Sequence, residues 1–250
     1  MSDYLMRDAA PLSAEEWERL DKVVIDTARQ YLVGRRFVKL VGPLGAGTEV
    51  VPIGVGEKRD FLRMHLIYQD FKLYWSDIEA SRRAGMGLEL GLAAMAAAGC
   101  ARQEDKMILG KMLEAAGNKT ELGDWSETGN AFEAVVQARK ELVADDFYGP
   151  YAVVLSPDLY ARTQRMARGM GRLEAKLITD LAEGGLFQSP LLEPDQGLVV
   201  SLGGHNFDLA VAQDLTVGYM GNEDLDHLFR VLERLVLRIK RPESICKFVA

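Results

Sequence analysis

The chain has 250 residues, of which 48% are hydrophobic and 27% are charged, and its net charge is −7. This composition excludes an intrinsically disordered chain, and the length predicts one large globular domain or two small ones. The acidic balance argues against nucleic acid as a partner, because phosphate-binding surfaces are rich in lysine and arginine.

Two features of the sequence bear on the cellular compartment. The N-terminal segment lacks the continuous apolar stretch of a secretory signal, and nowhere do eighteen apolar residues follow one another. Cys100 and Cys246 stand far apart without a CxxC spacing, which is typical of two reduced thiols. We therefore expect a soluble, cytoplasmic protein with no membrane partner.

The first element predicted along the chain is an amphipathic helix. Ser13 and Glu16 form a capping box, in which the hydroxyl accepts from a helical amide and the carboxylate reaches back to the cap amide. Apolar residues recur at helical spacing as far as Tyr31, and Gly34 ends the pattern. Residues 36–41 are then predicted to form a strand.

A long hairpin is predicted next, within residues 44–75. The segments 48–53 and 62–75 are rich in β-forming residues and flank a charged tip at 57–60. The second arm carries three aromatic or aliphatic side chains on one face, namely Phe71, Leu73 and Trp75. A hairpin of this length has little core of its own, so we expect a neighbouring element to bury its apolar side chains.

The remaining pattern mixes helices and strands. Helices are predicted at 78–83 after Ser76 or Asp77, at 88–98 before Gly99, at 106–116, at 132–142 after a loop over 117–129, after the Ser156 cap, and at 172–181. Strands are predicted at 152–155, 198–202, 207–212 and 215–219, while residues 229–239 suit either state. The predicted fold class is α+β.

The residue types that carry catalysis are not arranged for it. His65, His205 and His227 are isolated, without the spacing of a metal site, and neither a GxSxG elbow nor a Walker loop is present. The glycine-rich segments 42–47 and 169–171 lack a dinucleotide-binding spacing and are typical of turns. We therefore predict no catalytic residues and no metal site, which favours a structural or binding role.

Several segments, kept in order along the chain, resemble the encapsulin shell proteins, which are relatives of tailed-phage major capsid proteins. They are Ala10–Ser13 with Trp17 and Asp21, Gly34–Val38, Gly42-Pro43 with Gly45, Pro52–Gly54, Gly149–Tyr151, Gly184-Gly185 before Ser189-Pro190, Gln213–Tyr219, Phe229, and Arg241–Glu243. The most specific of these segments are Gln213–Tyr219, Phe229 and Arg241–Glu243. No single segment is decisive, but the order and spacing of the set are kept over essentially the whole chain.

The resemblance implies a Hong Kong 97-type phage capsid fold with a peripheral domain, an extended loop and an axial domain. The peripheral domain would comprise residues 1–43, 68–117 and 213–250, the extended loop 44–67, and the axial domain 118–212. The hairpin would then lie on a neighbouring subunit, and residues 229–239 would form a strand. The expected assembly is a homo-oligomer. The length of the chain favours the smallest closed shell, of sixty subunits, and a larger shell is the alternative.

The resemblance also implies a groove on the inner wall that binds the tail peptide of a cargo protein. Arg35 and Asp214 would be its polar contacts, with Leu215 beside them. Lys39 stands where some relatives carry an acidic residue, which bears on the charge of the tail that the groove accepts. Helix phase adds an apolar wall made by Ile25, Ala28 and Leu32. Alternatively, Arg35 and Asp214 form a structural ion pair.

Two further sites follow from the resemblance. A five-fold pore loop would comprise Arg168, Gly169, Met170, Gly171 and Arg172, where arginines would attract anions; the alternative is that these arginines are merely solvated. Some relatives bind a flavin near an aromatic residue at the end of the extended loop, and Tyr74 and Trp75 lie in that neighbourhood. The alternative for these two residues is aromatic packing, and no other cofactor is expected.

The expected cargo is a ferritin-like protein, with a role in iron storage, or a dye-decolourising peroxidase. Two alternative functions remain open from the sequence. One is a phage or prophage major capsid protein with the same fold, and the other, from a different class, is a hydrolase.

Overall fold

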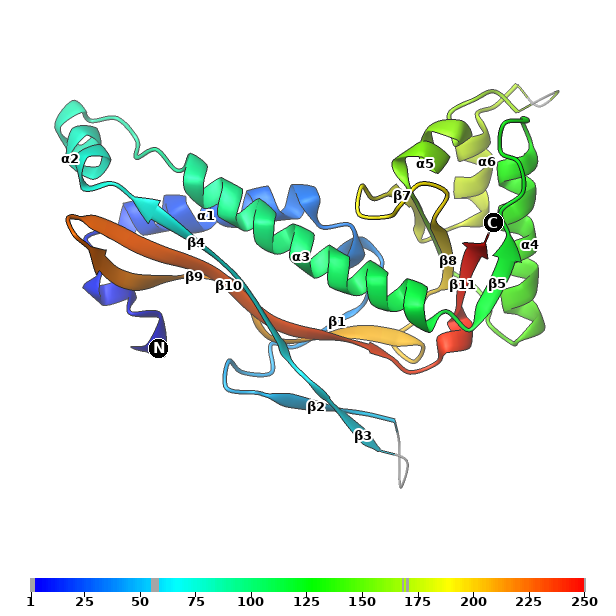
Figure 1. Ribbon diagram of the computed structural model, residues 1–250, viewed down its shortest axis with the longest axis horizontal. Coiled ribbons are helices and arrows are strands. Elements are labelled where there is room, and N and C mark those ends of the chain that lie inside the picture. The colour runs from blue at the N-terminus through cyan, green and yellow to red at the C-terminus, as the bar shows by residue number, and fades with distance from the viewer. Residues whose placement is uncertain (1–2, 55–58, 168, 170, 250) are drawn as a thin grey trace.

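The longest elements of the chain run side by side along one axis of an elongated molecule (Figure 1). A computed structural model describes residues 3–54, 59–167, 169 and 171–249. At one end of the long axis lies a second group of helices and strands, and a hairpin projects from the middle of the molecule. The arrangement is therefore a long sheet-and-helix body, a projecting hairpin and a smaller α+β end.

The long body is built on a four-stranded sheet with the order β1-β9-β10-β4. β9 (Phe207–Glu223) and β10 (Asp226–Ile239) form an antiparallel pair along nearly their whole length. β4 (His65–Leu73) adds antiparallel to β10, and the short β1 (Leu40–Val41) adds parallel to β9. The prediction of a strand over 229–239 is thus confirmed.

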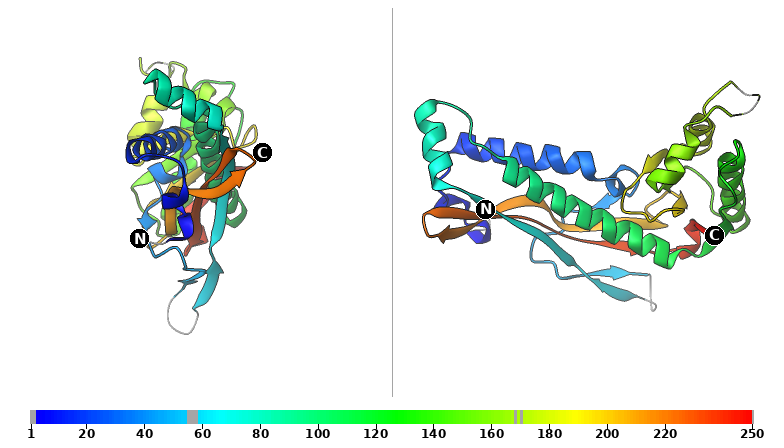
Figure 2. Two further views of the ribbon diagram at one scale, coloured as in Figure 1. Left: turned by 90° about the vertical axis from the view of Figure 1, so that its left-hand side faces the viewer. Right: turned by 45° about the horizontal axis from the view of Figure 1, so that its top comes forward.

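Two helices cover one face of this sheet, as the right-hand view of Figure 2 shows. α1 (Ala14–Tyr31) and α3 (Gly91–Ala115) contact each other, and α3 also contacts β4 and β10. The predicted capping box is present, because Ser13 Oγ accepts from Glu16 N and Glu16 Oε2 accepts from Ser13 N. α2 (Trp75–Ala84), which lies between α1 and α3 in the sequence, is at one end of the body (Figure 1).

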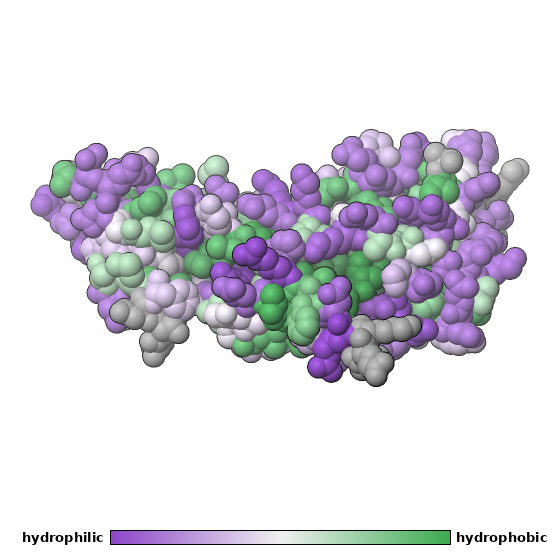
Figure 3. Space-filling view, turned by 60° about the horizontal axis from the view of Figure 1, so that its bottom comes forward, coloured by the Kyte–Doolittle hydropathy of each residue, from purple (hydrophilic) through white to green (hydrophobic). Residues whose placement is uncertain are grey.

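The hairpin consists of β2 (Val50–Ile53) and β3 (Asp60–Arg63), paired antiparallel. One of its sides packs on the sheet, where Val51 joins a small core with Ala210 and Val236. The opposite side is exposed to solvent, and Phe61 is 60% exposed. Figure 3 shows hydrophobic residues gathered on the middle of the face that carries the hairpin.

The smaller end contains a five-stranded sheet with the order β5-β11-β8-β6-β7. Its strands and helices are β5 (Asn118–Glu121), α4 (Asn130–Ala144), β6 (Tyr151–Leu155), α5 (Pro157–Thr163), α6 (Glu174–Leu181), β7 (Gly185–Gln188), β8 (Gly197–Ser201) and β11 (Ile245–Val249). The fully buried strand β6 and the Ser156 cap of α5 agree with the prediction. Trp125 and Leu142 lie in the core of this end.

Four predictions of local structure are wrong. Gly99 does not end a helix, because α3 runs without a break from Gly91 to Ala115 and joins the two predicted helices 88–98 and 106–116. A β-carbon at Gly99 would stand 3.4 Å from the Gln69 side chain of β4, so glycine permits close approach of helix and sheet. Likewise β9 is one strand instead of two, because pairing with β10 continues past the irregularity near Asp214.

The other two corrections concern the segments on either side of the hairpin. Residues 36–41 do not form one strand; a 3₁₀ turn, η3 (Gly34–Arg36), precedes the two-residue β1. The second hairpin arm does not continue as one unit to Trp75, because its later part joins the main sheet as β4. Trp75 begins α2 and is 48% exposed, unlike the buried Phe71 and Leu73.

Smaller differences concern the ends of elements and the loops. α2 begins at Trp75, with Tyr74 at the cap position instead of Ser76 or Asp77. α6 begins at Glu174, and the predicted loop 117–129 contains β5. The sequence contains no clear signal for the short strands β7 and β11. β7 is the edge strand of its sheet, and β11 is the C-terminal strand of the chain, so both depend on pairing with distant segments.

Candidate functional site

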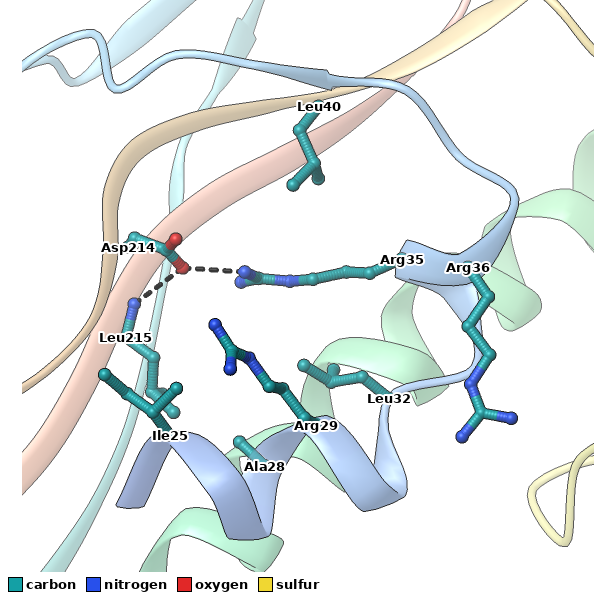
Figure 4. Close-up of a pocket in the computed structure, with 9 residues that line it drawn as sticks. All are labelled: Ile25, Ala28, Arg29, Leu32, Arg35, Arg36, Leu40, Asp214 and Leu215. Carbon is teal, nitrogen blue, oxygen red and sulfur yellow. Dashed lines mark hydrogen bonds and ion pairs between the residues drawn. The ribbon is translucent and has the colours of Figure 1, made fainter. Parts of the chain in front are cut away.

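A pocket of about 430 Å³ lies between the C-terminal half of α1 and the middle of β9 (Figure 4). Its volume is in the range of sites that take small ligands or a few side chains of a peptide. Nine residues line it, namely Ile25, Ala28, Arg29, Leu32, Arg35, Arg36, Leu40, Asp214 and Leu215. The floor is aliphatic and the polar groups are guanidinium groups and one carboxylate.

Two local structures aim these side chains into one space. On α1 the lining residues follow the i, i+3, i+4, i+7 spacing of a single helix face. On β9 the register with β10 shifts where Gln213 faces Arg234 and Thr216 faces Leu232, so that Asp214 and Leu215 lie in a bulge. Bulges turn side chains out of the regular alternation of a strand, which brings both residues to the pocket.

Arg35 connects the pocket to the interior of the protein. Its Nε and one terminal nitrogen donate to both oxygens of Glu104 at 2.8–3.1 Å, and the same terminal nitrogen donates to Glu233 Oε2 at 2.8 Å. Its other terminal nitrogen donates to Asp214 Oδ1 at 2.7 Å. Glu104 and Glu233 are fully buried, whereas the Asp214 side chain is 63% exposed. One guanidinium therefore joins two interior carboxyl groups to the pocket surface.

The pKa directions follow from this burial. Burial raises the pKa of Glu233 well above its ordinary range, and the charge of Glu104 beside it acts in the same direction. Burial would lower the pKa of Arg35, but the hydrogen bonds and charges of Glu104, then of Glu233 and Asp214, raise it instead. The folded state therefore favours a proton on Glu233 and a permanent charge on Arg35.

Asp105, the next residue of α3, holds the turn that carries Arg35. Its carboxylate accepts hydrogen bonds from the backbone N–H groups of Val33 and Gly34 at 2.7 and 2.8 Å. Burial raises the pKa of Asp105 to about 6, although the two N–H donors act to lower it. This contact explains why the chain turns after α1 in place of the predicted strand.

The structure brings together six of the seven residues predicted for the groove. Lys39 is the exception, since it is absent from the lining and its side chain lies against Gly204. Arg35 and Asp214 form an ion pair, which is the contact named in the alternative interpretation of these two residues. Sequence reasoning missed five participants, which are Arg29, Arg36, Leu40, Glu104 and Glu233.

The sequence contains a signal for two of these five residues, Arg29 and Glu104. Arg29 follows Ile25 by four residues and precedes Leu32 by three, so helix phase alone places it on the predicted wall. Glu104 follows Ala101 by three residues and precedes Ile108 by four, so helix phase places it on the apolar face of α3, where a buried carboxylate needs a partner. Glu233 gave no such signal, because its position on β10 is defined only by pairing with β9.

The predicted pore loop connects α5 and α6. Arg168 and Met170 lie outside the described residues. The base of the loop is closed by a bridge between Met166 and Leu173, and Gly169 and Gly171 both have positive φ angles, of 76° and 63°. Arg172 forms an ion pair with Asp180 of α6 at 2.7 Å, so part of its charge is compensated within the subunit.

The two residues predicted for flavin lie at the start of α2. Tyr74 and Trp75 are both about half exposed, and Trp75 N donates to Asp226 Oδ1 at 3.3 Å. None of the described pockets has either aromatic ring in its lining. An isoalloxazine ring would need a surface to enclose it, and the linings of these four pockets supply neither aromatic ring for it.

The histidines each have a separate local environment. His65 Nε2 lies 3.1 Å from Lys111 Nζ, and His227 Nδ1 lies 3.1 Å from the Tyr219 hydroxyl oxygen. Among the residues that the structure describes, no three histidine, cysteine or carboxylate side chains are grouped to hold a metal ion. Within the same residues, no helix combines the length and the apolar character required to cross a bilayer.

Comparison with known proteins gives a consistent result. The sequence matches the protein family described as "Encapsulating protein for peroxidase" over residues 1–236. It is 44% identical to the type 1 encapsulin shell protein EncA of Myxococcus xanthus, over 98% of this chain and 96% of that protein. It is 37% identical to the diheme-cytochrome-encapsulin shell fusion protein of Kuenenia stuttgartiensis, over 94% and 73% of the two chains.

Solved structures show the same architecture. The virus-like particle from Pyrococcus furiosus superimposes with a TM-score of 0.81 at 18% identity, over 94% of this chain and 100% of that chain. The capsid of Myoviridae phage XM1 superimposes with a TM-score of 0.57 at 10% identity, over 84% and 88%. These similarities confirm the predicted Hong Kong 97-type capsid fold.

Proposed function

The chain belongs to the family of encapsulin shell proteins, and from this premise we propose that its subunits close into an icosahedral compartment that holds a cargo enzyme. Members of this family are structural shell proteins and not enzymes, so chemistry belongs to the cargo. The phage capsid alternative shares the fold at 10% identity, whereas the 44% identity is to an encapsulin shell. We propose sixty subunits per shell, the smallest closed icosahedron.

The observation that carries the assembly proposal is the exposed apolar side of the hairpin β2–β3. Phe61 and Val50 expose large hydrophobic side chains there, although the other side of the hairpin is packed. Exposed apolar patches of this kind mark interaction surfaces. A neighbouring subunit that covers them would remove this apolar area from water at every repeated contact, which stabilises a closed shell.

Electron microscopy of the purified protein tests this proposal. We expect hollow, uniform icosahedral particles, and a monomer at working concentration would contradict the assembly. Phe61→Glu places a charge in the proposed contact and should leave dispersed subunits or open fragments. Phe61→Leu keeps an apolar side chain at the same position and should form shells, which separates the loss of contact from an effect of substitution as such.

We assign the docking of cargo to the pocket between α1 and β9. Ile25, Ala28, Leu32 and Leu215 offer an apolar floor, and Arg35 with Asp214 offers polar groups beside it. An extended tail peptide that inserts one or two aliphatic side chains would gain their burial and meet hydrogen-bonding groups at the edge. α1 and α3 cover the same face of the sheet, which we take as the inner wall.

The docking proposal is tested by loading of a co-expressed cargo. Ile25 is 38% exposed in the pocket, so Ile25→Glu should abolish loading while shells still form. Leu92 on α3 is 42% exposed and lies outside the pocket lining, so Leu92→Glu is a matched control that should load normally. Equal loading by both variants would exclude this pocket as the docking site.

The cargo that we propose is a ferritin-like protein or a dye-decolourising peroxidase, in a cytoplasmic compartment. The Kuenenia stuttgartiensis relative is a fusion with a diheme cytochrome, which supports a redox enzyme as the class of cargo. Iron storage would follow for a ferritin-like cargo. Mass spectrometry of proteins that co-purify with the native shells tests the identity.

A further inference from the structure

Arg29 is a charged residue of the pocket that is only weakly paired with the rest of the chain. Its only ion pair among the described residues is to Asp26 at 3.9 Å, and Asp26 is itself bonded to Lys22 at 2.6 Å. The Arg29 side chain is 75% exposed. In Figure 4 it rises from α1 toward Arg35 and Asp214, whereas Arg36 points away from them. Its five N–H donors therefore lie at the mouth of the pocket, directed inward.

The charge of Arg35 is compensated from within. Its guanidinium donates to two buried carboxyl groups as well as to Asp214, so it brings little net charge to the pocket. Asp214 Oδ1 is in turn occupied by Arg35 and by the backbone N–H of Leu215. Glu104 alone balances the charge of Arg35, so Asp214 contributes one negative charge to the mouth. Arg29 and Arg36 contribute two positive charges, so the mouth is net positive.

Arg36 adds to this positive charge. Among the described residues its guanidinium has no ion pair and donates only to Gln30 O, at 3.5 Å. Charges within about 8–10 Å act on one another at physiological salt. A cationic patch thus borders an apolar pocket on a chain whose net charge is −7, and such a patch favours an anionic partner.

We propose that Arg29 selects docking segments that carry a carboxylate beside their aliphatic anchor residues. The aliphatic side chains would fill the floor formed by Ala28, Leu32 and Leu215, and the carboxylate would receive a paired hydrogen bond from the Arg29 guanidinium. The carboxylate can belong to an acidic side chain or to the end of the cargo chain. This inference rests on the proposed docking function and adds its charge specificity.

The test uses assembled shells co-expressed with a fluorescent reporter that carries different tails. The tails share a segment of two leucines separated by small residues and differ after the second leucine, which is followed by glutamate, glutamine or lysine. The glutamine tail is also made with a Gly-Ser extension, which moves the chain end away. The ratio of reporter to shell protein is measured after purification, with a tailless reporter as the baseline.

We expect the glutamate tail to load about fivefold better than the lysine tail, since a rim ion pair replaces a like-charge contact. Arg29→Glu should reverse this preference, and Arg29→Lys should retain it in part. Arg36→Glu changes the same charge on a side chain that points away, so it is the matched control and should alter the preference less. A glutamine tail that loses loading on extension would assign the carboxylate to the chain end.

The outcomes separate the inference from the docking function. Equal loading of all tails, abolished by Ile25→Glu, would overturn the role of Arg29 and leave the pocket as the docking site. Better loading of the lysine tail by the unmodified shell would overturn it as well. Loading of no tail above the tailless reporter would count against docking in this pocket altogether.

Discussion

Glu104 on α3 and Glu233 on β10 share one donor in the interior of the protein, because the same terminal nitrogen of Arg35 donates to Glu104 Oε2 and to Glu233 Oε2, each at 2.8 Å. Two ionised carboxylates at this separation would repel each other in a medium that screens them poorly, so a proton retained on one of them makes the contact favourable. Burial raises the pKa of Glu233 well above its ordinary range, which favours Glu233 as the partner that keeps the proton.

The first prediction follows from this protonation. Glu233→Gln replaces a neutral carboxyl by a neutral amide of the same shape, and we expect the free energy of unfolding at pH 7 to change by less than about 1 kcal/mol. Glu104→Gln removes the carboxylate that makes the paired contact with Arg35, and we expect a loss of about 2–4 kcal/mol. Denaturant unfolding at one fixed subunit concentration measures both. Equal destabilisation would mean that Glu233 is ionised.

The second prediction concerns pH and Asp105. Its pKa is raised from 3.8 to about 6 by burial, so the folded state binds this proton more tightly than the unfolded chain does. The contribution to stability is therefore complete below pH 3.8 and is lost as the pH rises to about 6. The loss is on the order of 3 kcal/mol, because each pH unit is worth about 1.4 kcal/mol.

Asp105→Asn tests this pH dependence. The variant should be less stable at every pH, because the amide can accept from only one of the N–H groups of Val33 and Gly34. The decrease in stability between pH 4 and pH 6 should nevertheless be smaller than in the unmodified protein. A slope that is unchanged by the substitution would show that another group titrates in this interval.

Local signals in the sequence predicted the elements that depend on near neighbours. The capping box of α1, the cap of α5 and the buried β6 were all read correctly, because each rests on residues a few positions apart. The apolar wall of the pocket was predicted for the same reason, since the period of α1 puts Ile25, Ala28 and Leu32 on one face.

Elements defined by distant contacts were not predictable in the same way. Gly99 is a helix stop by propensity, yet packing of α3 on β4 carries the helix through it. Residues 36–41 have the composition of a strand, but a carboxylate about seventy positions away, on Asp105, holds a turn at their start. The interior carboxyl partners of Arg35 come from α3 and β10, so they are defined only once the whole chain is folded. The strand over 229–239 is predicted from the family resemblance, because its residue pattern suits a helix as well as a strand.

The third prediction compares two glycines within α3. Gly110 is exposed and a β-carbon there would meet nothing within 4 Å, so Gly110→Ala should stabilise the protein by about 0.5–1 kcal/mol through helix propensity. Gly99→Ala has the same helical benefit, but its β-carbon would lie 3.4 Å from the Gln69 side chain. We expect a smaller gain or none, measured by unfolding of both variants side by side. A larger gain at Gly99 would mean that Gln69 moves aside without cost.

The fourth prediction concerns the loop proposed to line a pore. Arg172 is paired with Asp180. Removal of the carboxylate should therefore make the loop more positive, and removal of the guanidinium should make it more negative. Asp180→Asn leaves Arg172 uncompensated, which should speed the permeation of anions and slow that of cations by about twofold. Arg172→Ala should have the opposite effect, because it leaves the carboxylate of Asp180.

Quenching of an enclosed fluorophore by iodide and by caesium measures the two permeation rates separately. Arg162 on α5 pairs with Asp195 at 3.9 Å and belongs to the same end of the molecule, so Arg162→Ala is the matched control for a general change in surface charge. If both Asp180→Asn and Arg172→Ala leave the ratio of iodide to caesium rates unchanged, this loop does not set the charge selectivity of the shell. An equal shift in the control would assign the effect to the overall surface charge of the smaller α+β end instead of to the local field of the loop.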